Sequence, residues 1–402
     1  MTDFLVHEHL VRPGEKRTPT QDTHIPVHLP QLFVLFLSEN PVVNPHYEEV
    51  RKESEEWLAK SVTYPNECSF DERSRRILSK TDFSYFCSVA APDAGPEELR
   101  TVCDWGNWVF PFDDSTSLPT FVARVLSLSL KVFDNGGLKD DPARAQQLID
   151  SLLAGMRDEG AQRPSGGDSP LVRVHNTVWQ RVAQVWSLLT YFWFGQFADE
   201  TQASPVGVRR RFAASMGEYC KGSIEQVRTC SMGRYPSLDE MLVLRRQSAG
   251  VAPLFALVEY AHKLDIPDHV FECRSIKEIE RIGVDLVLLQ NDILSYCKEE
   301  KEGVTHNVVA ICRHSGMPAQ MAFNYIGNML VARYRDWYLA LAELPSWGEK
   351  VDAQVQQYIR GVQNVVMANL NWSFRSGRYF GDAKDIVRKS MVVRVKRQSA
   401  DV

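Results

Sequence analysis

From Asn44 onward, apolar residues of this 402-residue chain recur with the 3.6-residue period of an α-helix. In the segment NPHYEEVRKESEEWLAK, for example, one helical face carries Tyr47, Val50, Trp57 and Leu58 with only Ser54 between them, and charged residues lie elsewhere. Strand-like alternation is limited to the segment MVVRVKR near the end. The pattern predicts an all-α protein, whose further helical stretches are 73–90, 96–110, 142–157, 171–198, 205–231, 237–263, 275–299, 305–313, 317–343 and 349–375.

The periodic stretches are expected to form a single domain. Residues 1–44 are rich in Pro, His and Thr without a helical period, which predicts an irregular arm. The helical domain then spans 45–385, and 386–402 is expected to be a tail. A division into two domains at 158–170 is an alternative, but a long surface loop explains this polar, glycine-rich stretch as well. No period of 20–50 residues repeats, which excludes a solenoid.

Composition excludes several classes of function. The formal net charge is −5, so the chain lacks the basic footprint of a nucleic-acid-binding protein. Its 8 Cys include no CxxC pair, which argues against a zinc site or a disulfide framework and suits a reducing compartment. The beginning lacks a signal pattern, and the apolar run 32–37 is far shorter than the ~20 residues of a membrane helix. We expect a cytoplasmic protein without a membrane span.

Oxygen-bearing side chains follow one helical face at 291–299. Asn291, Ser295 and Glu299 are spaced i, i+4 and i+8, which places them along one side of a helix. Amide, hydroxyl and carboxylate oxygens suit Mg²⁺, which completes its shell with waters and phosphate oxygens. Lys298 beside them could hold a phosphate oxygen. The preceding run 282–289 is mostly apolar and indicates a buried helix; a solvated helix end is the alternative.

This cluster and four other segments resemble, in the same order, the motifs of class I terpene synthases. The sequence Asn-Asp-x-x-Ser-x-x-Lys-Glu is similar to their NSE metal motif. The other segments are ELRTVCDWGNWVFPFDD at 98–114, VLRRQSAG at 243–250, KEGVTHNVV at 301–309 and NWSFRSGRYF at 371–380. The likeness extends from about Asn44 to Phe380 and is greatest to basidiomycete fungal sesquiterpene synthases of the protoilludene type.

The resemblance implies a fold and a reaction. The fold is the single-domain class I terpenoid synthase helical bundle with a central active-site cavity. The reaction is the ionisation and usually the cyclisation of farnesyl diphosphate to a sesquiterpene, with three Mg²⁺ ions and release of diphosphate. Acyclic alcohols such as nerolidol or linalool are a further product class. The enzyme is expected to be a monomer or a homodimer with this small-molecule substrate as its ligand.

Residue by residue, the resemblance also implies the composition of the site. The metal ligands are Asp113, Asp114 and Asp134 in an aspartate-rich motif, and Asn291, Ser295 and Glu299 in the NSE motif. The diphosphate contacts are Arg245, Lys298, Arg378 and Tyr379, with Arg246 as the alternative to Arg245 because residue type cannot separate two adjacent arginines.

Aromatic side chains could line the cavity and stabilise a carbocation by cation–π attraction. The candidates are Phe83, Tyr85, Phe86, Trp105, Trp108, Phe110 and Trp372, of which only two or three are expected to reach the cavity. His306 is expected to be a structural hydrogen-bonding residue rather than a base.

The aspartate-rich motif departs from the family pattern, Asp-Asp-x-x-Asp, commonly within FDDxFDNG. Ser117 stands at the fifth position, whereas removal of 115–131 would restore FPFDDVFDNGG. We interpret 115–131 as an insertion, such as a retained intron; the alternative is a true helix extension in a divergent enzyme. Because the motif is interrupted, a catalytically impaired or inactive homologue is an alternative function. A chain-elongating isoprenyl diphosphate synthase is disfavoured, because it should carry two aspartate-rich motifs.

Overall fold

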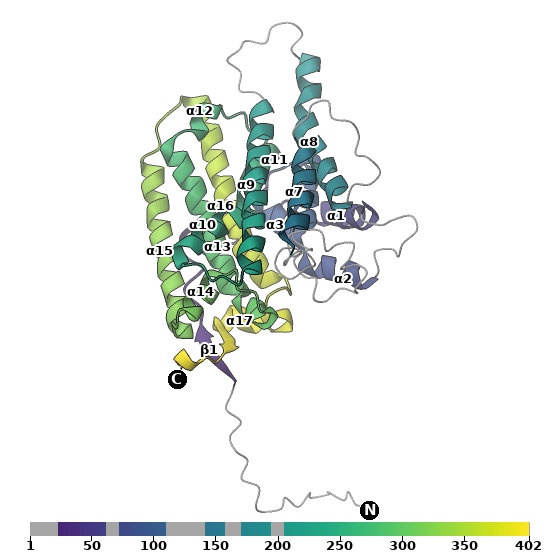
Figure 1. Ribbon diagram of the computed structural model, residues 1–402. Helices are drawn as coiled ribbons and strands as arrows, with labels where there is room; N and C mark the ends of the chain where they lie inside the picture. Colours follow the sequence, from purple (N-terminus) through teal and green to yellow (C-terminus); the bar gives the residue numbers. More distant parts are fainter. Residues whose placement is uncertain (1–22, 62–71, 110–140, 157–169, 194–204, 402) are drawn as a thin grey trace, which may run out of the picture.

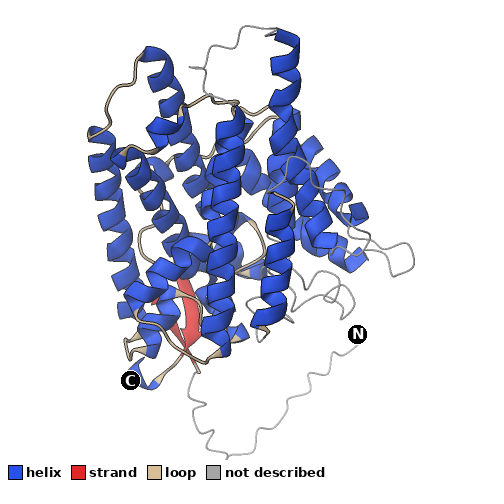
Figure 2. Cartoon of the chain, turned by 45° about the horizontal axis from the view of Figure 1, so that its top comes forward, coloured by secondary structure: helices blue, strands red, loops and turns tan. Residues whose placement is uncertain are grey.

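A computed structural model describes residues 23–61, 72–109, 141–156, 170–193 and 205–401. Over these residues the chain is a bundle of α-helices with one two-stranded sheet (Figures 1 and 2), which confirms the predicted all-α class. The helices are α1 (Tyr47–Ser61), α2 (Glu72–Thr81), α3 (Phe83–Ala90), α4 (Pro96–Val109), α7 (Pro142–Ala154), α8 (Pro170–Trp193), α9 (Pro205–Ser231), α10 (Leu238–Ser248), α11 (Val251–Ala261), α12 (Asp268–Phe271), α13 (Arg274–Glu302), α14 (Val308–His314), α15 (Ala319–Ala342), α16 (Glu349–Arg375) and α17 (Lys384–Ser390), with 3-10 turns η1 (Leu35–Ser38), η3 (Gly381–Ala383) and η4 (Ser399–Asp401).

Helix α13 carries the expected metal-binding face through the interior of the bundle. It packs against α15 and α16 and also contacts α10, α11 and α14. Every residue from Ile282 to Cys297 except Asn291 is buried. This confirms the prediction that the helix entering the polar cluster is buried, and close packing on several sides holds the helix in a defined orientation.

The predicted helix 237–263 is divided into α10 and α11. Gly250 between them has a φ of 68°, a left-handed conformation that glycine adopts readily. The stretch Leu238–Ala261 is the one part of the described chain that is long and apolar enough to cross a membrane, and 67% of its most apolar window is buried inside the bundle. The buried core helix of a globular protein can be equally long and apolar.

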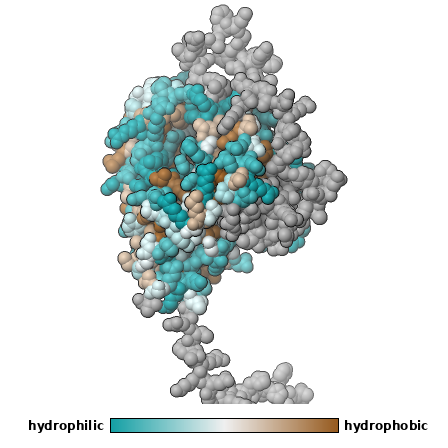
Figure 3. Space-filling view, in the orientation of Figure 1, coloured by the Kyte–Doolittle hydropathy of each residue, from teal (hydrophilic) through white to brown (hydrophobic). Residues whose placement is uncertain are grey.

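Helices α11 and α16 contact α13, and α9 and α3 pack behind them. α9 packs against α10 and α11, and α3 packs against α16 (Figure 1). At the crossing of α11 and α16, a Cβ on Gly361 would lie 2.1 Å from Cγ1 of Val258, so only glycine permits this approach. The face seen in Figure 3 is mostly hydrophilic with scattered hydrophobic patches, because the apolar residues are largely inside.

Two short segments, within the ranges predicted as an irregular arm and a tail, pair with each other near the ends of the described chain. Strand β1 (His24–His28) runs antiparallel to β2 (Val392–Lys396), and Val27 lies opposite Val393 with both buried. Strand β2 was indicated by its alternation, whereas Pro26 obscured β1 in the sequence. A proline lacks the N–H of a strand residue but is tolerated at a sheet edge, and both strands of this sheet are edges.

Candidate active site

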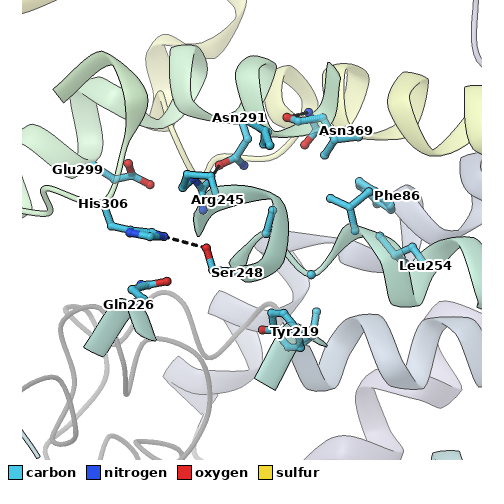
Figure 4. A pocket seen from close by; sticks show the side chains of 16 residues that line it. Phe86, Tyr219, Gln226, Arg245, Ser248, Leu254, Asn291, Glu299, His306 and Asn369 are labelled. Atoms are coloured by element: carbon cyan, nitrogen blue, oxygen red, sulfur yellow. Dashed lines mark hydrogen bonds between the residues drawn. The ribbon is translucent and has the colours of Figure 1, made fainter. Parts of the chain in front are cut away.

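A cavity lies among α3, α4, α9, α10, α11, α13 and α16 (Figure 4), as expected for this bundle. Figure 4 shows Glu299 and His306 toward one end and Phe86 and Leu254 toward the other. At one end the lining is polar and includes Gln226, Arg245, Ser248, Asn291, Glu299 and His306. Elsewhere it is mostly apolar and includes Phe86, Val109, Val251, Leu254, Val287 and Leu288, with Asn369 as a polar exception. The cavity therefore joins a polar region to an apolar one.

The three oxygen-bearing residues of α13 share the face that the sequence predicts. Asn291 and Glu299 line the cavity, and Ser295 is buried one turn from each. Nδ2 of Asn291 donates to Oη of Tyr379 at 2.8 Å, and Oε2 of Glu299 accepts from Nδ2 of Asn307 at 2.8 Å. Both bonds restrict the side chains on the face that would contact a ligand.

This donor set fits a hard divalent cation. An amide oxygen, a hydroxyl and a carboxylate from one helix face are a set that Mg²⁺ can use while keeping waters or phosphate oxygens. Burial, together with the nearby Asp292 carboxylate, raises the pKa of Glu299. Within the described residues the hydrogen-bond donor to this carboxylate is the neutral amide of Asn307. A buried carboxylate in such surroundings is one that a bound cation stabilises as the anion.

The structure distinguishes Arg245 from Arg246. Arg245 lines the cavity, and its Nη2 donates to Oδ1 of Asp292 at 2.5 Å and lies 3.4 Å from Oδ1 of Asn291. Arg246 instead donates from Nε to Oδ1 of Asp285 at 2.6 Å. Of the two adjacent arginines, Arg245 is the one placed to meet a ligand of the cavity.

Sequence reasoning missed two residues that hold the polar end together, Asp292 and Asn307. Oδ2 of Asp292 accepts from the Val308 amide at 2.7 Å, so this carboxylate joins Arg245 to the start of α14. Asn307 caps α14 through Oδ1 while its Nδ2 binds Glu299. An asparagine directly before an apolar helical run is a recognisable N-cap signal. The contact of Asn307 with Glu299, by contrast, has no signal in the sequence.

The other three residues expected to contact diphosphate are Tyr379, Arg378 and Lys298, and each has a different partner in the structure. Tyr379 reaches Asn291 on α13, and burial raises the pKa of its phenol. The Arg378 guanidinium lies 5.6 Å from the centre of the Tyr379 ring, and burial lowers the pKa of Arg378. Lys298 pairs with Glu302 at 2.9 Å. In the described part of the chain, neither Lys298 nor Arg378 is among the residues that line the cavity.

Among the candidate aromatic residues that the structure describes, Phe86 lines the cavity. Phe83 stacks on it with ring centres 4.5 Å apart, and Trp372 meets Phe83 edge-on at 5.3 Å. The other described candidates, Tyr85, Trp105 and Trp108, are also core residues. Aromatic packing supports the cavity wall rather than forming most of it.

His306 and Ser248 connect the loop after α13 to the end of α10. Nε2 of His306 lies 2.8 Å from Oγ of Ser248 (Figure 4). Burial lowers the pKa of His306 well below its ordinary value, so the ring is neutral near pH 7. The contact agrees with the expected structural role of His306.

Several predicted residues lie outside the described residues. They are the first-motif ligands Asp113, Asp114 and Asp134, together with Phe110, Ser117 and the segment 115–131.

Comparisons with known proteins identify the family of this chain. A sequence model of the family "Terpene synthase family 2, C-terminal metal binding" matches residues 131–336. Silphinene synthase of Penicillium patulum is 38% identical over 371 residues, which cover 91% of this chain and 89% of that protein. Sesquiterpene synthase 3 of Postia placenta is 29% identical over 354 residues, which cover 87% and 83%. The likeness to protoilludene-type enzymes in particular stays a prediction.

Solved structures show the same fold. The crystal structure of α-eudesmol synthase has a TM-score of 0.65 to this chain at 18% identity, covering 84% of this chain and 98% of that one. The family match spans half of the sequence, and the Penicillium enzyme is similar over most of it. This protein therefore belongs to the terpene synthase family.

Proposed function

We propose that the protein is a Mg²⁺-dependent sesquiterpene synthase that ionises farnesyl diphosphate, usually cyclises the resulting cation and releases diphosphate. One observation carries the proposal: Asn291, Glu299 and the Arg245 guanidinium line one end of a cavity, with Ser295 buried on the same face of α13, and the lining at the other end is mostly apolar. A polar end suits a diphosphate, and an apolar end suits an isoprenoid chain. The relatives named sesquiterpene synthase and silphinene synthase support this assignment.

The polar end supplies binding and orientation. Asn291, Ser295 and Glu299 would hold one Mg²⁺ ion, and Asp113, Asp114 and Asp134 would hold two more. Divalent ions, when bound, offset the negative charge that develops on the departing diphosphate. The guanidinium of Arg245 presents several donors in a plane, a geometry that suits phosphate oxygens. The Asp292 carboxylate holds this side chain at the cavity wall.

The apolar end protects the reacting chain from water. Phe86, Leu254 and Val287 offer no proton acceptor in their side chains, so a carbocation beside them is not captured early. The face of Phe86 can also attract positive charge. The product then depends on the contour of these walls, and acyclic alcohols such as nerolidol or linalool are the alternative products.

The experiment is product analysis with purified protein. The 402-residue chain and a chain lacking 115–131 are each incubated with geranyl, farnesyl or geranylgeranyl diphosphate, with Mg²⁺ or with a chelator. We expect a volatile sesquiterpene and free diphosphate from farnesyl diphosphate with Mg²⁺ only. A product from geranyl or geranylgeranyl diphosphate alone would change the assigned substrate. If neither form of the protein gave a product, the proposal would be contradicted.

A catalytically impaired homologue is the second candidate, because 115–131 interrupts the first metal motif. The family match, residues 131–336, begins at the last residue of this segment. We further propose a cytoplasmic location and a monomer or homodimer.

A further inference from the structure

One amide side chain, that of Asn369 on α16, lines the cavity away from its polar end. Figure 4 places Asn369 on the side of Phe86 rather than on that of Glu299 and His306. The residue is 1% exposed, so its polar atoms are almost completely removed from bulk solvent. A polar group in this position is costly unless its hydrogen-bonding capacity is used.

The orientation of the amide follows from its partners on α13. Nδ2 of Asn369 lies 3.3 Å from the Val287 carbonyl oxygen and 3.2 Å from Oε1 of Gln290. A backbone carbonyl can only accept a hydrogen bond, so the NH₂ end of the amide must face Val287. The carbonyl end, Oδ1, consequently does not face this acceptor.

No hydrogen bond to Oδ1 of Asn369 comes from the residues that the structure describes, and this atom is not one of the fully enclosed side-chain atoms that lack a partner there, so it keeps surface toward the cavity. The two bonds made by Nδ2 explain how α16 is tied to α13, but they do not explain an acceptor left over at the cavity. A structural tie between the two helices does not require an acceptor with accessible surface at the cavity. The leftover acceptor points instead to a role toward the bound substrate.

We propose that Asn369 is a specificity-determining residue, whose Oδ1 stabilises positive charge on one part of the reacting chain and thereby selects the carbon at which the cation is quenched. This inference rests on the proposed function. A fixed carbonyl dipole interacts strongly with a cation in a low-dielectric cavity, because little water competes with it. A neutral amide neither donates nor removes a proton under these conditions, so Asn369 forms no bond with the substrate and acts through its dipole.

The test compares product ratios, which do not depend on how much of the enzyme is active. Asn369→Leu removes the dipole at similar volume, and Asn369→Ala is a second variant that avoids overpacking. Two controls keep Asn369 intact. Gln290→Leu removes one partner of Nδ2, and Asn371→Ala changes a neighbouring amide of α16 that bonds to the Met367 carbonyl.

All variants are assayed with farnesyl diphosphate and Mg²⁺ in the 402-residue chain, or in the chain lacking 115–131 if only that form turns over. We expect both Asn369 variants to change the ratio of the main product to the other products by about tenfold or more, a change of one decade in relative rate. Diphosphate release should fall less than the product ratio changes, and the controls should keep the native ratio.

Two outcomes would overturn the inference, and a third would refute the proposed function on which it rests. The native product ratio in a folded Asn369→Leu or Asn369→Ala variant would show that Oδ1 does not act on the cation. An equal change in Gln290→Leu would assign the effect to the tie between α13 and α16. A parent enzyme that releases no diphosphate from farnesyl diphosphate would instead refute the proposed function itself, and the two failures are therefore distinguishable.

Discussion

Asn291 on α13 donates a hydrogen bond to the phenol oxygen of Tyr379, 88 positions further along the chain, at 2.8 Å. The bond faces the NH₂ end of the Asn291 amide toward Tyr379, and Oδ1 lies 3.4 Å from Nη2 of Arg245. The Asn291 amide, whose oxygen is expected to bind a metal, therefore contacts both Arg245 and Tyr379, which are expected to bind diphosphate. A change at any of these three side chains should affect the other two.

The first prediction concerns the oxygen donors of α13. Replacing Glu299 by Gln, or Asn291 or Ser295 by Ala, should lower turnover by about 100-fold or more, because each change weakens the electrostatic stabilisation of the leaving group. Diphosphate release measured against Mg²⁺ concentration checks the prediction. The exposed Lys301 lies in the same charged run, and Lys301→Ala is the control. If Lys301→Ala lowered turnover as much as the changes at Asn291, Ser295 and Glu299, the cluster would be only a solvated helix end.

The second prediction separates the adjacent arginines by a charge-conserving change. Arg245→Lys should lower turnover strongly, because a lysine cannot reproduce several planar donors toward Asp292 and a phosphate. Arg246→Lys should leave turnover nearly unchanged, because its partner Asp285 also accepts hydrogen bonds from Arg281 and Arg333. Steady-state diphosphate release and thermal unfolding are measured together. The reverse order of activities would show that the wrong arginine has been assigned to the cavity.

The third prediction separates the two roles of Asn307. Asn307→Asp keeps the oxygen that caps α14 but replaces the donor to Glu299 by a second carboxylate. Stability without Mg²⁺ should fall, because the new carboxylate is buried beside Glu299 and faces the Asp292 carbonyl oxygen, to which Asn307 donates. The Mg²⁺ concentration for half-maximal activity should change by about 10–100-fold, the scale seen for residues that orient metal ligands. We expect this concentration to rise, because Glu299 loses the donor that orients it.

Asn307→Ala serves as the comparison, since it removes both the cap and the donor. It should additionally lower the free energy of unfolding by about 0.5–2 kcal/mol, the usual effect of losing an N-cap. Unchanged Mg²⁺ dependence in both variants would exclude a role for Asn307 in holding Glu299.

The fourth prediction concerns a buried ion pair near the end of the chain. Nη2 of Arg313 lies 3.0 Å from Oδ2 of Asp401, and the two side chains are 1% and 2% exposed. Burial acts to raise the pKa of Asp401, but hydrogen bonds from Arg313 and from the Ala319 and Gln398 amides outweigh it and hold this pKa below its ordinary value. The unfolded chain therefore binds the proton more tightly than the folded one. The pair contributes stability above the unfolded pKa of ~3.9 and loses it as pH falls through the folded pKa.

Asp401→Asn should accordingly lower the free energy of unfolding near pH 7 by about 3–5 kcal/mol, because it leaves Arg313 buried with a neutral partner. The difference from the parent should shrink as pH approaches 3. Denaturant unfolding from pH 3 to pH 7 measures both effects, with the exposed Asp382→Asn as the control. A difference that is constant with pH would show that the charge of Asp401 is not responsible.

The fifth prediction concerns the segment 115–131. If this segment is a retained intron, the mature transcript should join FPFDD directly to VFDNGG or a near variant. Deleting the segment should then raise turnover by orders of magnitude, because a metal-bound carboxylate must lie within ~2.0–2.1 Å of Mg²⁺ and the deletion returns Asp134 to the family spacing. Equal activity of the two chains would show that the segment is tolerated and that Asp134 is dispensable.

Helix positions and the face formed by Asn291, Ser295 and Glu299 were predictable from the sequence because they are periodic and local. A residue's place around a helix axis depends on its distance along the chain from its neighbours. The stretch 275–299 accordingly corresponds to α13, Arg274–Glu302. The order of the motifs also pointed to the family and hence to a cavity.

Only the tertiary structure decided which distant residues meet. Arg245 and Arg246 carry the same side chain, and the rotation of α10 relative to α13 places one in the cavity and the other on Asp285. Strand β1 contains Pro26 and shows little alternation, so its pairing with β2 has no local signal. The second contact of Asn307 exists because the chain after α13 folds back onto Glu299. Local pattern follows from neighbouring residues, whereas these contacts depend on how segments far apart in the sequence pack together.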